Sequence, residues 1–203
     1  MPSLQKSLTA ERPKAPASRR AGELPPDERR ATIAAAALSL LLEHGTNITT
    51  RQIAEAANTP EGTTFRVFPD KDSIIRAAVD LALDPGPAEQ AFLAIDRTLP
   101  FEEQLVAAVE IIQRRLADIG RLVSAVGGPF VFADRDRELP DFSALASLFA
   151  PHEARLRYGA ERTARLLAAF TLAFSHPVLH GNEPMAPRDL VAVLLDGIRA
   201  PSC

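Results

Sequence analysis

The sequence predicts an all-α fold, and two observations support this. Several segments repeat apolar residues every three or four positions, which is the period of an amphipathic helix, whereas no segment shows the strict alternation of a half-buried strand. The clearest repeat covers residues 101–126, where the apolar positions alternate steps of four and three: Leu105, Val109, Ile112, Leu116, Ile119, Val123 and Val126. Two further long helices are expected at about 159–179 and 186–199.

Length and composition bound the class of protein. The chain has 203 residues, of which 46% are apolar and 24% are charged, as in ordinary globular proteins. Its single cysteine, Cys203, cannot form an internal disulfide, and no apolar run reaches the roughly 18–20 residues that span a membrane. The N-terminus lacks the apolar segment of a secretory signal, so a cytoplasmic location is expected. The net charge of −3 argues mildly against a nucleic-acid-binding protein.

The N-terminal segment has a composition of its own. Residues 1–24 contain prolines and small residues with few aliphatic side chains, which predicts a disordered arm. Residues 1–22 carry five basic residues against one acidic residue. Two interpretations are open: a solvated tail, or a basic arm that reaches a phosphate backbone through Arg19 and Arg20.

The first helix is expected to follow this arm. Pro25 and Pro26 stand where a helix tolerates proline, in its first turn. An amphipathic stripe follows at Ile33, Ala36, Ala37, Leu40 and Leu41. Gly45 then offers a left-handed stop.

A short helix is predicted next by its cap. Thr49 and Gln52 have the spacing of a capping box, in which the threonine hydroxyl and the glutamine side chain satisfy each other's backbone N–H groups. The helix should end at Asn58, because asparagine tolerates positive φ better than most residues.

A second short helix should follow at once. Thr59, followed by a proline, is interpreted as its N-cap, and Pro69 ends it after residues 61–68 because the residue before a proline avoids the α region. Asp70 can then cap a longer helix. The arrangement over residues 50–68 is typical of a helix-turn-helix, whose second helix enters the major groove of DNA.

These residues resemble the DNA-binding domain of the TetR family of bacterial transcriptional regulators. The resemblance covers about residues 28–83 and has the family's spacing without a gap at Gly45, Thr49, Thr50, Ile53, Ala54, Gly62, Thr63, Phe65, Phe68 and Lys71. It implies about nine helices in three parts. These are a disordered basic arm (1–24), a three-helix DNA-binding domain with the helix-turn-helix (25–70), and a larger helical effector-binding and dimerisation domain (71–203).

The resemblance also implies a function. Members are homodimers that bind palindromic operators in double-stranded DNA, and most are repressors that a small-molecule effector releases. The DNA contacts that it implies lie at Thr50, Arg51, Gly62, Thr63, Thr64, Phe65, Arg66, Val67 and Lys71. Arginine binds guanine or phosphate in a bidentate manner, glycine lets the backbone approach DNA closely, and lysine supplies a compact charge for phosphate.

Four positions depart from the family pattern. Asn58 stands where the family usually has glycine, and Thr59 replaces a usual valine. Phe65 and Val67 stand where tyrosine and histidine are common, so two polar contacts are lost. We expect the domain to dock on DNA as in the family, with fewer polar contacts and with a larger contribution of the basic arm to the affinity.

The C-terminal half supplies candidate residues for the dimer and the effector. The resemblance places a homodimer interface on the last two long helices, whose apolar residues are Leu166, Leu167, Phe170, Phe174, Leu190, Val191, Leu194 and Ile198. Pockets for apolar effectors are mostly apolar with a few polar groups. The candidates for such a pocket are Phe130, Phe132, Phe170 and Phe174, with Tyr158 and His176 as the polar members.

Other classes of function find little support. The sequence has no nucleophile–base pair and no glycine-rich phosphate loop, so no enzyme activity, catalytic residue or cofactor is expected. His176 and His180 have the spacing of a metal site, but Pro177 interrupts the helix and no further ligands complete the set, so no metal is expected. The alternative that stays open is a small-molecule-binding helical protein without operator activity.

The distribution of charge removes the objection to DNA binding. Residues 1–80 carry 11 basic and 10 acidic residues, whereas residues 81–203 carry 12 and 16. The acidic excess therefore lies in the half that is expected to face away from DNA.

Overall fold

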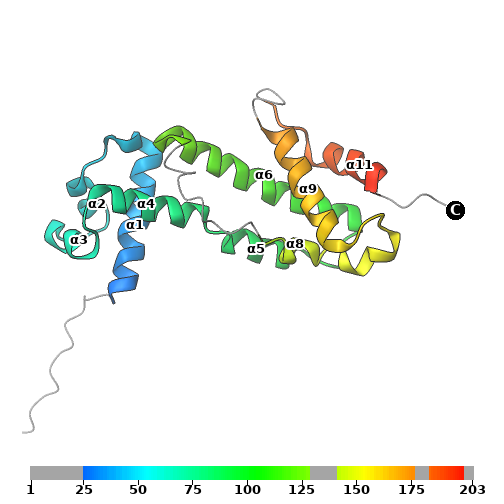
Figure 1. Ribbon diagram of the computed structural model, residues 1–203, viewed down its shortest axis with the longest axis horizontal. Helices are drawn as coiled ribbons and strands as arrows, with labels where there is room; N and C mark the ends of the chain where they lie inside the picture. The colour runs from blue at the N-terminus through cyan, green and yellow to red at the C-terminus, as the bar shows by residue number, and fades with distance from the viewer. Residues whose placement is uncertain (1–24, 129–140, 177–182, 199–203) are drawn as a thin grey trace, which may run out of the picture.

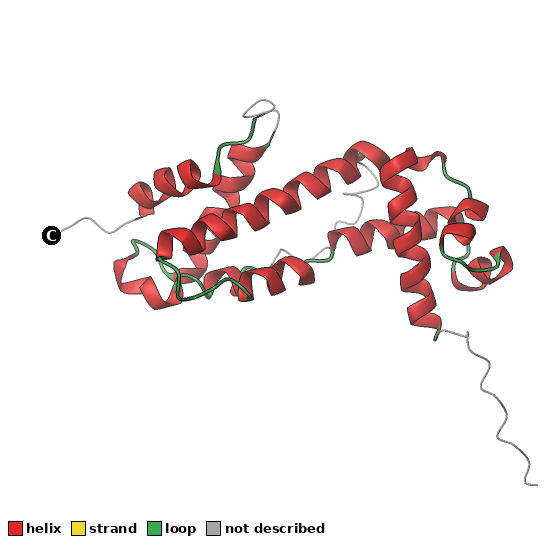
Figure 2. Ribbon diagram, turned by 180° about the vertical axis from the view of Figure 1, so that it is seen from behind, coloured by secondary structure: helices red, strands yellow, loops and turns green. Residues whose placement is uncertain are grey.

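The computed structural model describes residues 25–128, 141–176 and 183–198. Within these ranges the chain forms nine α-helices and two 3-10 helices and contains no strand (Figures 1 and 2). This confirms the predicted all-α fold. None of the helices in these ranges has the length and apolar character needed to cross a membrane.

The N-terminal unit contains five elements: α1 (Pro26–His44), η1 (Gly45–Asn47), α2 (Thr50–Ala56), α3 (Glu61–Val67) and α4 (Lys71–Leu83). The helices α2 and α3 have seven residues each and are too short to be stable alone. They share one core with α1 and α4. This core includes Ile33, Ala37, Leu41, Ile48, Ile53, Ala57, Phe68, Ile74, Ile75, Ala78 and Val79. The long helices thus hold the two short ones in place.

The C-terminal unit begins at α5 (Gly86–Leu93). The elements after it are α6 (Phe101–Val126), α8 (Ser143–Ala146), η2 (Ala150–Arg155), α9 (Ala160–Ser175) and α11 (Pro187–Ile198). Its core includes Leu105, Val109, Leu145, Leu148, Phe149, Leu167, Leu190 and Leu194. The guanidinium of Arg188 donates two parallel hydrogen bonds of 2.7 and 3.0 Å to the carboxylate of Glu103, which ties α11 to α6.

The helix α6 belongs to both units, as Figure 1 shows by its course between them. Leu105 and Val109 in its first half are buried in the C-terminal core, whereas Leu122 and Val126 near its end are buried in the N-terminal core. The ends of α1 and α6 also approach closely. Gly45 has φ +62°, and a Cβ added there would lie 3.1 Å from the carbonyl oxygen of Ala125. Glycine is therefore required at this contact.

The predicted helices are found with few changes. The helix predicted from the repeat at 101–126 has those bounds, and Gly45 and Asn58 have the positive φ that their positions suggested. Only Asp84 and Pro85 separate α4 from α5, because α5 starts at Gly86 with a proline in its first turn. The helix expected to end near residue 179 ends at Ser175. The short elements α8 and η2 were not predicted from the sequence.

Candidate nucleic-acid interface

The capping box predicted for α2 is present. The backbone N–H of Thr49 donates to Oε1 of Gln52 at 2.8 Å, and the backbone N–H of Gln52 donates to Oγ1 of Thr49 at 3.2 Å. The turn after α2 passes through Asn58 with φ 49°. Ile53 and Ala54 face the core, so the opposite side of α2 faces solvent.

The cap predicted for α3 was wrong. Pro60 occupies the N-cap position, and no side chain caps the helix. The hydroxyl of Thr59 instead donates to the carbonyl oxygen of Ala57 at 3.1 Å. This bond stabilises the turn between α2 and α3 and leaves the N–H groups at the start of α3 without a side-chain partner.

The helix α3 presents one face to solvent and one to the core. Glu61, Gly62, Phe65 and Arg66 are exposed, and positions four residues apart lie on the same side of a helix. Phe65 is 50% exposed, so about half of a large apolar residue faces solvent here. This exposed face is the part of α3 that can meet a DNA groove.

Thr64 corrects the predicted DNA contacts. Its side chain is fully buried, and its hydroxyl has no hydrogen-bond partner in the structure. A thymine methyl group cannot reach this side chain, so Thr64 is a packing residue of the N-terminal core. Thr63 and Val67 are half-buried at the edges of the exposed face.

Arg30 fixes the end of α3, and the sequence had given no indication of this. Its Nη1 donates to the carbonyl oxygen of Val67 at 3.1 Å, and its guanidinium carbon lies 4.3 Å from the centre of the Phe68 ring. A cation at a helix C-terminus is also favoured by the helix dipole. Arg30 therefore joins α1 to the last turn of α3. Only the three-dimensional neighbourhood identifies it, because 37 residues separate it from Val67.

The start of α2 carries two of the predicted contacts, and both are held by carboxylates. Oγ1 of Thr50 donates to Oε1 of Glu61 at 3.0 Å. Nε of Arg51 donates to Oε1 of Glu55 at 2.9 Å, and this hydrogen bond raises the pKa of the guanidinium. Both groups are at the surface, where such pairs are weak. Arg51 can exchange Glu55 for a DNA group at little cost.

Lys71 lies at the start of α4 and is half-buried. Its Nζ donates to the carbonyl oxygen of Thr46 at 2.7 Å, which joins α4 to η1. An ammonium group has three N–H donors, so two remain for a phosphate. The preceding residue, Asp70, caps α4, and the backbone N–H of Ser73 lowers the pKa of its carboxyl group.

The described part of this unit is not basic. Residues 25–83 carry six Lys and Arg against eight Asp and Glu. The remaining predicted contacts, Arg19 and Arg20, lie outside the described residues, together with the rest of the arm. Any excess of positive charge in the N-terminal half must therefore come from residues 1–24.

The effector candidates that the structure describes do not form one site. The rings of Phe170 and Phe174 pack 4.5 Å apart against the C-terminal core. Tyr158 precedes α9, with Arg162 over its ring at 4.6 Å, and His176 follows the other end of α9. A helix of 16 residues is about 24 Å long, so one small pocket cannot contain both polar candidates. Phe130 and Phe132 lie outside the described residues.

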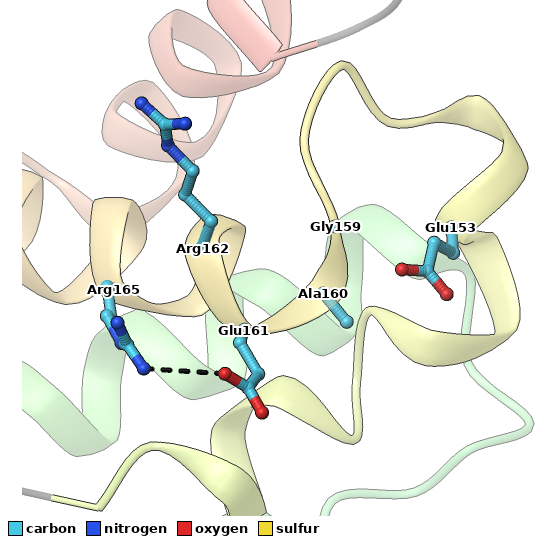
Figure 3. A pocket seen from close by; sticks show the side chains of 6 residues that line it. All are labelled: Glu153, Gly159, Ala160, Glu161, Arg162 and Arg165. Atoms are coloured by element: carbon cyan, nitrogen blue, oxygen red, sulfur yellow. Dashed lines mark hydrogen bonds and ion pairs between the residues drawn. The ribbon is translucent and has the colours of Figure 1, made fainter.

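A hollow of about 580 Å³ opens at the start of α9 (Figure 3), but it is polar. It is lined by Glu153, Gly159, Ala160, Glu161, Arg162 and Arg165. Arg165 and Glu161 form an ion pair across 3.4 Å. None of the predicted effector residues lines this hollow. The described residues also contain no group of three or more potential metal ligands.

Comparison with known families bears directly on α1 to α4. Residues 33–78 match the family model described as bacterial regulatory proteins, tetR family. The chain carries a TetR-family DNA-binding domain. The resemblance found in the sequence is thereby confirmed, and the chain has the architecture of a DNA-binding transcriptional regulator. No curated protein matches the chain.

Solved structures extend the likeness to the whole TetR-like fold. A TetR transcriptional regulator from Streptomyces coelicolor is 24% identical over 85% of this chain and 99% of its own, with a TM-score of 0.50. NalD, the secondary repressor of the MexAB-OprM multidrug efflux pump in Pseudomonas aeruginosa, is 19% identical over 87% of this chain and 98% of its own, with a TM-score of 0.52. At these identities the likeness establishes the fold.

Proposed function

We propose that the protein binds a palindromic operator as a homodimer and represses transcription until a small-molecule effector releases it. The exposed face of α3, within a domain that matches the TetR family, carries this proposal. The proposed DNA contacts are Thr50, Arg51, Gly62, Thr63, Phe65, Arg66, Val67 and Lys71, with Arg19 and Arg20 from the arm. A regulator of this kind acts on chromosomal DNA in the cytoplasm.

The proposed dimer interface uses the outer face of α9 and α11. Leu167, Leu190, Val191 and Leu194, which the sequence had suggested for this interface, are buried within a single chain. Leu166, which the sequence also suggested, is 37% exposed on α9, and Leu172 and Val193 are 47% and 51% exposed. Figure 1 shows α9 and α11 at the end of the molecule opposite to α2 and α3. A dimer formed there leaves α2 and α3 of both protomers accessible to DNA.

The proposed effector response runs through α4 and α6. Nη1 of Arg115 on α6 donates to the carbonyl oxygen of Ala82 at 2.9 Å, which joins α6 to the last turn of α4. The end of α6 also packs into the N-terminal core, where it contacts α1, η1 and α4. An effector that binds better when α6 takes another position shifts the population of dimers toward that conformation. In it, the spacing of the two α3 helices no longer fits successive major grooves, so the dimer leaves the DNA.

The proposal is tested by selecting DNA from a random library with the purified protein. We expect a palindrome to be enriched and its affinity to fall steeply with salt, since phosphate contacts release counterions. Failure to enrich any palindrome would favour a small-molecule-binding protein without operator activity.

A double variant tests the contacts. Replacing Arg51 and Arg66 by alanine should weaken binding to the selected palindrome by more than about tenfold, since each charged contact contributes about 1.5–3 kcal/mol. The matched control replaces Arg114 and Arg157, two exposed arginines of the C-terminal half, and should bind as the wild type does. Light scattering should show a dimer in all three proteins. Equal affinity of the double variant and the control in a mobility-shift titration would contradict the assignment.

A further inference from the structure

The exposed face of α3 carries one carboxylate among its described residues, that of Glu61. Glu61 is the first residue of α3 and is exposed. It lies four positions before Phe65, so the two side chains share the face that meets the DNA groove. A carboxylate at this place approaches a polyanion, which is unfavourable unless the DNA supplies a hydrogen-bond donor.

The structure holds this carboxylate at the junction of α2 and α3. Oγ1 of Thr50 donates to Oε1 of Glu61 at 3.0 Å, and Glu61 is near enough to Arg51 to contribute to the raised pKa of that guanidinium. An ionised carboxylate has about four acceptor sites. The contact with Thr50 uses one of them, so the group stays oriented while further sites can accept from a base.

The major groove limits the choice of base. Cytosine presents only a donor there, its N4 amino group. Adenine presents the N6 amino group beside the N7 acceptor, and N7 repels a carboxylate. Guanine and thymine present acceptors. A fixed carboxylate therefore favours cytosine over the three other bases.

We propose that Glu61 reads a cytosine in each half of the operator by accepting a hydrogen bond from its N4 amino group. This inference rests on the proposed operator binding. It adds a specificity determinant that selects one base, whereas Arg51 and Lys71 are assigned to contacts that position the domain or bind guanine or phosphate.

The test compares the full-length wild type with the Glu61→Gln variant in selections from the same random library. Glutamine keeps an Oε1 acceptor for Thr50, so α3 retains its anchor. It also presents an amide, which binds N6 and N7 of adenine in a bidentate manner. We expect one symmetric position of the palindrome to change from cytosine to adenine, with a preference of about tenfold for each protein in competition mobility shifts.

The matched control is Asp72→Asn, which removes one negative charge from the exposed first turn of α4. It should select the same bases as the wild type, although its overall affinity rises through weaker repulsion of phosphate. An unchanged base at every position in the Glu61→Gln selection would overturn the inference while operator binding stands. If neither protein enriches a palindrome, operator binding itself fails, and the role of Glu61 fails with it.

Discussion

Gly62 offers a substitution for which folding and DNA binding should respond in opposite directions. A Cβ added at Gly62 meets no heavy atom within 4 Å, and its φ is not positive. Alanine therefore fits the free protein without strain. Because glycine costs a helix about 0.5–1 kcal/mol relative to alanine, Gly62→Ala should raise the free energy of unfolding by up to that amount. In a chain of this size the melting temperature rises by about 1–4 °C.

DNA binding should weaken in the same variant. If the backbone of Gly62 rests against the DNA, the added methyl group forces the domain outward by about the length of one bond, roughly 1.5 Å. Such a displacement breaks at least one charged hydrogen bond, which is worth about 1.5–3 kcal/mol. The dissociation constant for the selected palindrome should therefore rise by about ten- to a hundredfold.

Gly120 provides the control, because it is also a helical glycine with no heavy atom within 4 Å of an added Cβ. It lies in α6, away from the proposed interface. Gly120→Ala should gain about 0.5–1 kcal/mol of stability without any change in affinity. Thermal unfolding and mobility-shift titration are measured on both variants. A Gly62→Ala protein that binds as tightly as Gly120→Ala would refute the close approach of α3 to DNA.

Four further predictions concern folding and affinity. Gly45→Ala should lower the free energy of unfolding by roughly 1–3 kcal/mol, because its backbone conformation suits glycine alone; an unchanged denaturation midpoint would contradict this. Arg30→Ala removes the hydrogen bond at the end of α3, and about 1 kcal/mol of stability and some operator affinity should be lost together. Deleting residues 1–22 should weaken operator binding and flatten its salt dependence, whereas equal slopes would exclude an arm contact. The lowered pKa of Asp70 contributes stability that is present above its unfolded pKa and is lost as the pH falls below about 4. In Asp70→Asn that part of the acid-induced loss, followed by circular dichroism, should be absent.

The local signals of the sequence predicted most of the fold. The capping box at Thr49, the positive φ of Asn58 and the long repeat from residue 101 to 126 are each set by neighbours in the chain, and all three are found. The short elements α8 and η2 carry no such signal, because tertiary packing decides whether a segment of four to six residues is helical.

The candidate site was harder to predict because it depends on which way a short helix faces. Thr63 and Thr64 are alike in sequence, and a helix of seven residues has too few positions to define its buried side. Only the packing of α3 on the core shows that Thr64 points inward. Arg30 and Glu61 escaped notice for a related reason. Their contacts join residues 37 and 11 positions apart. Contacts at such separations leave no periodic pattern in the sequence.

The membership of α6 in both cores has a consequence for how the chain unfolds. A fragment that ends after α4 would lose Leu122 and Val126 from its interior, and burying each such side chain contributes about 1.5–3 kcal/mol. That loss is comparable to the whole stability of a small domain. The N-terminal unit of α1 to α4 is therefore not an autonomous folding unit. Heat or denaturant should melt both halves in one cooperative transition, since neither half keeps its interior once α6 departs.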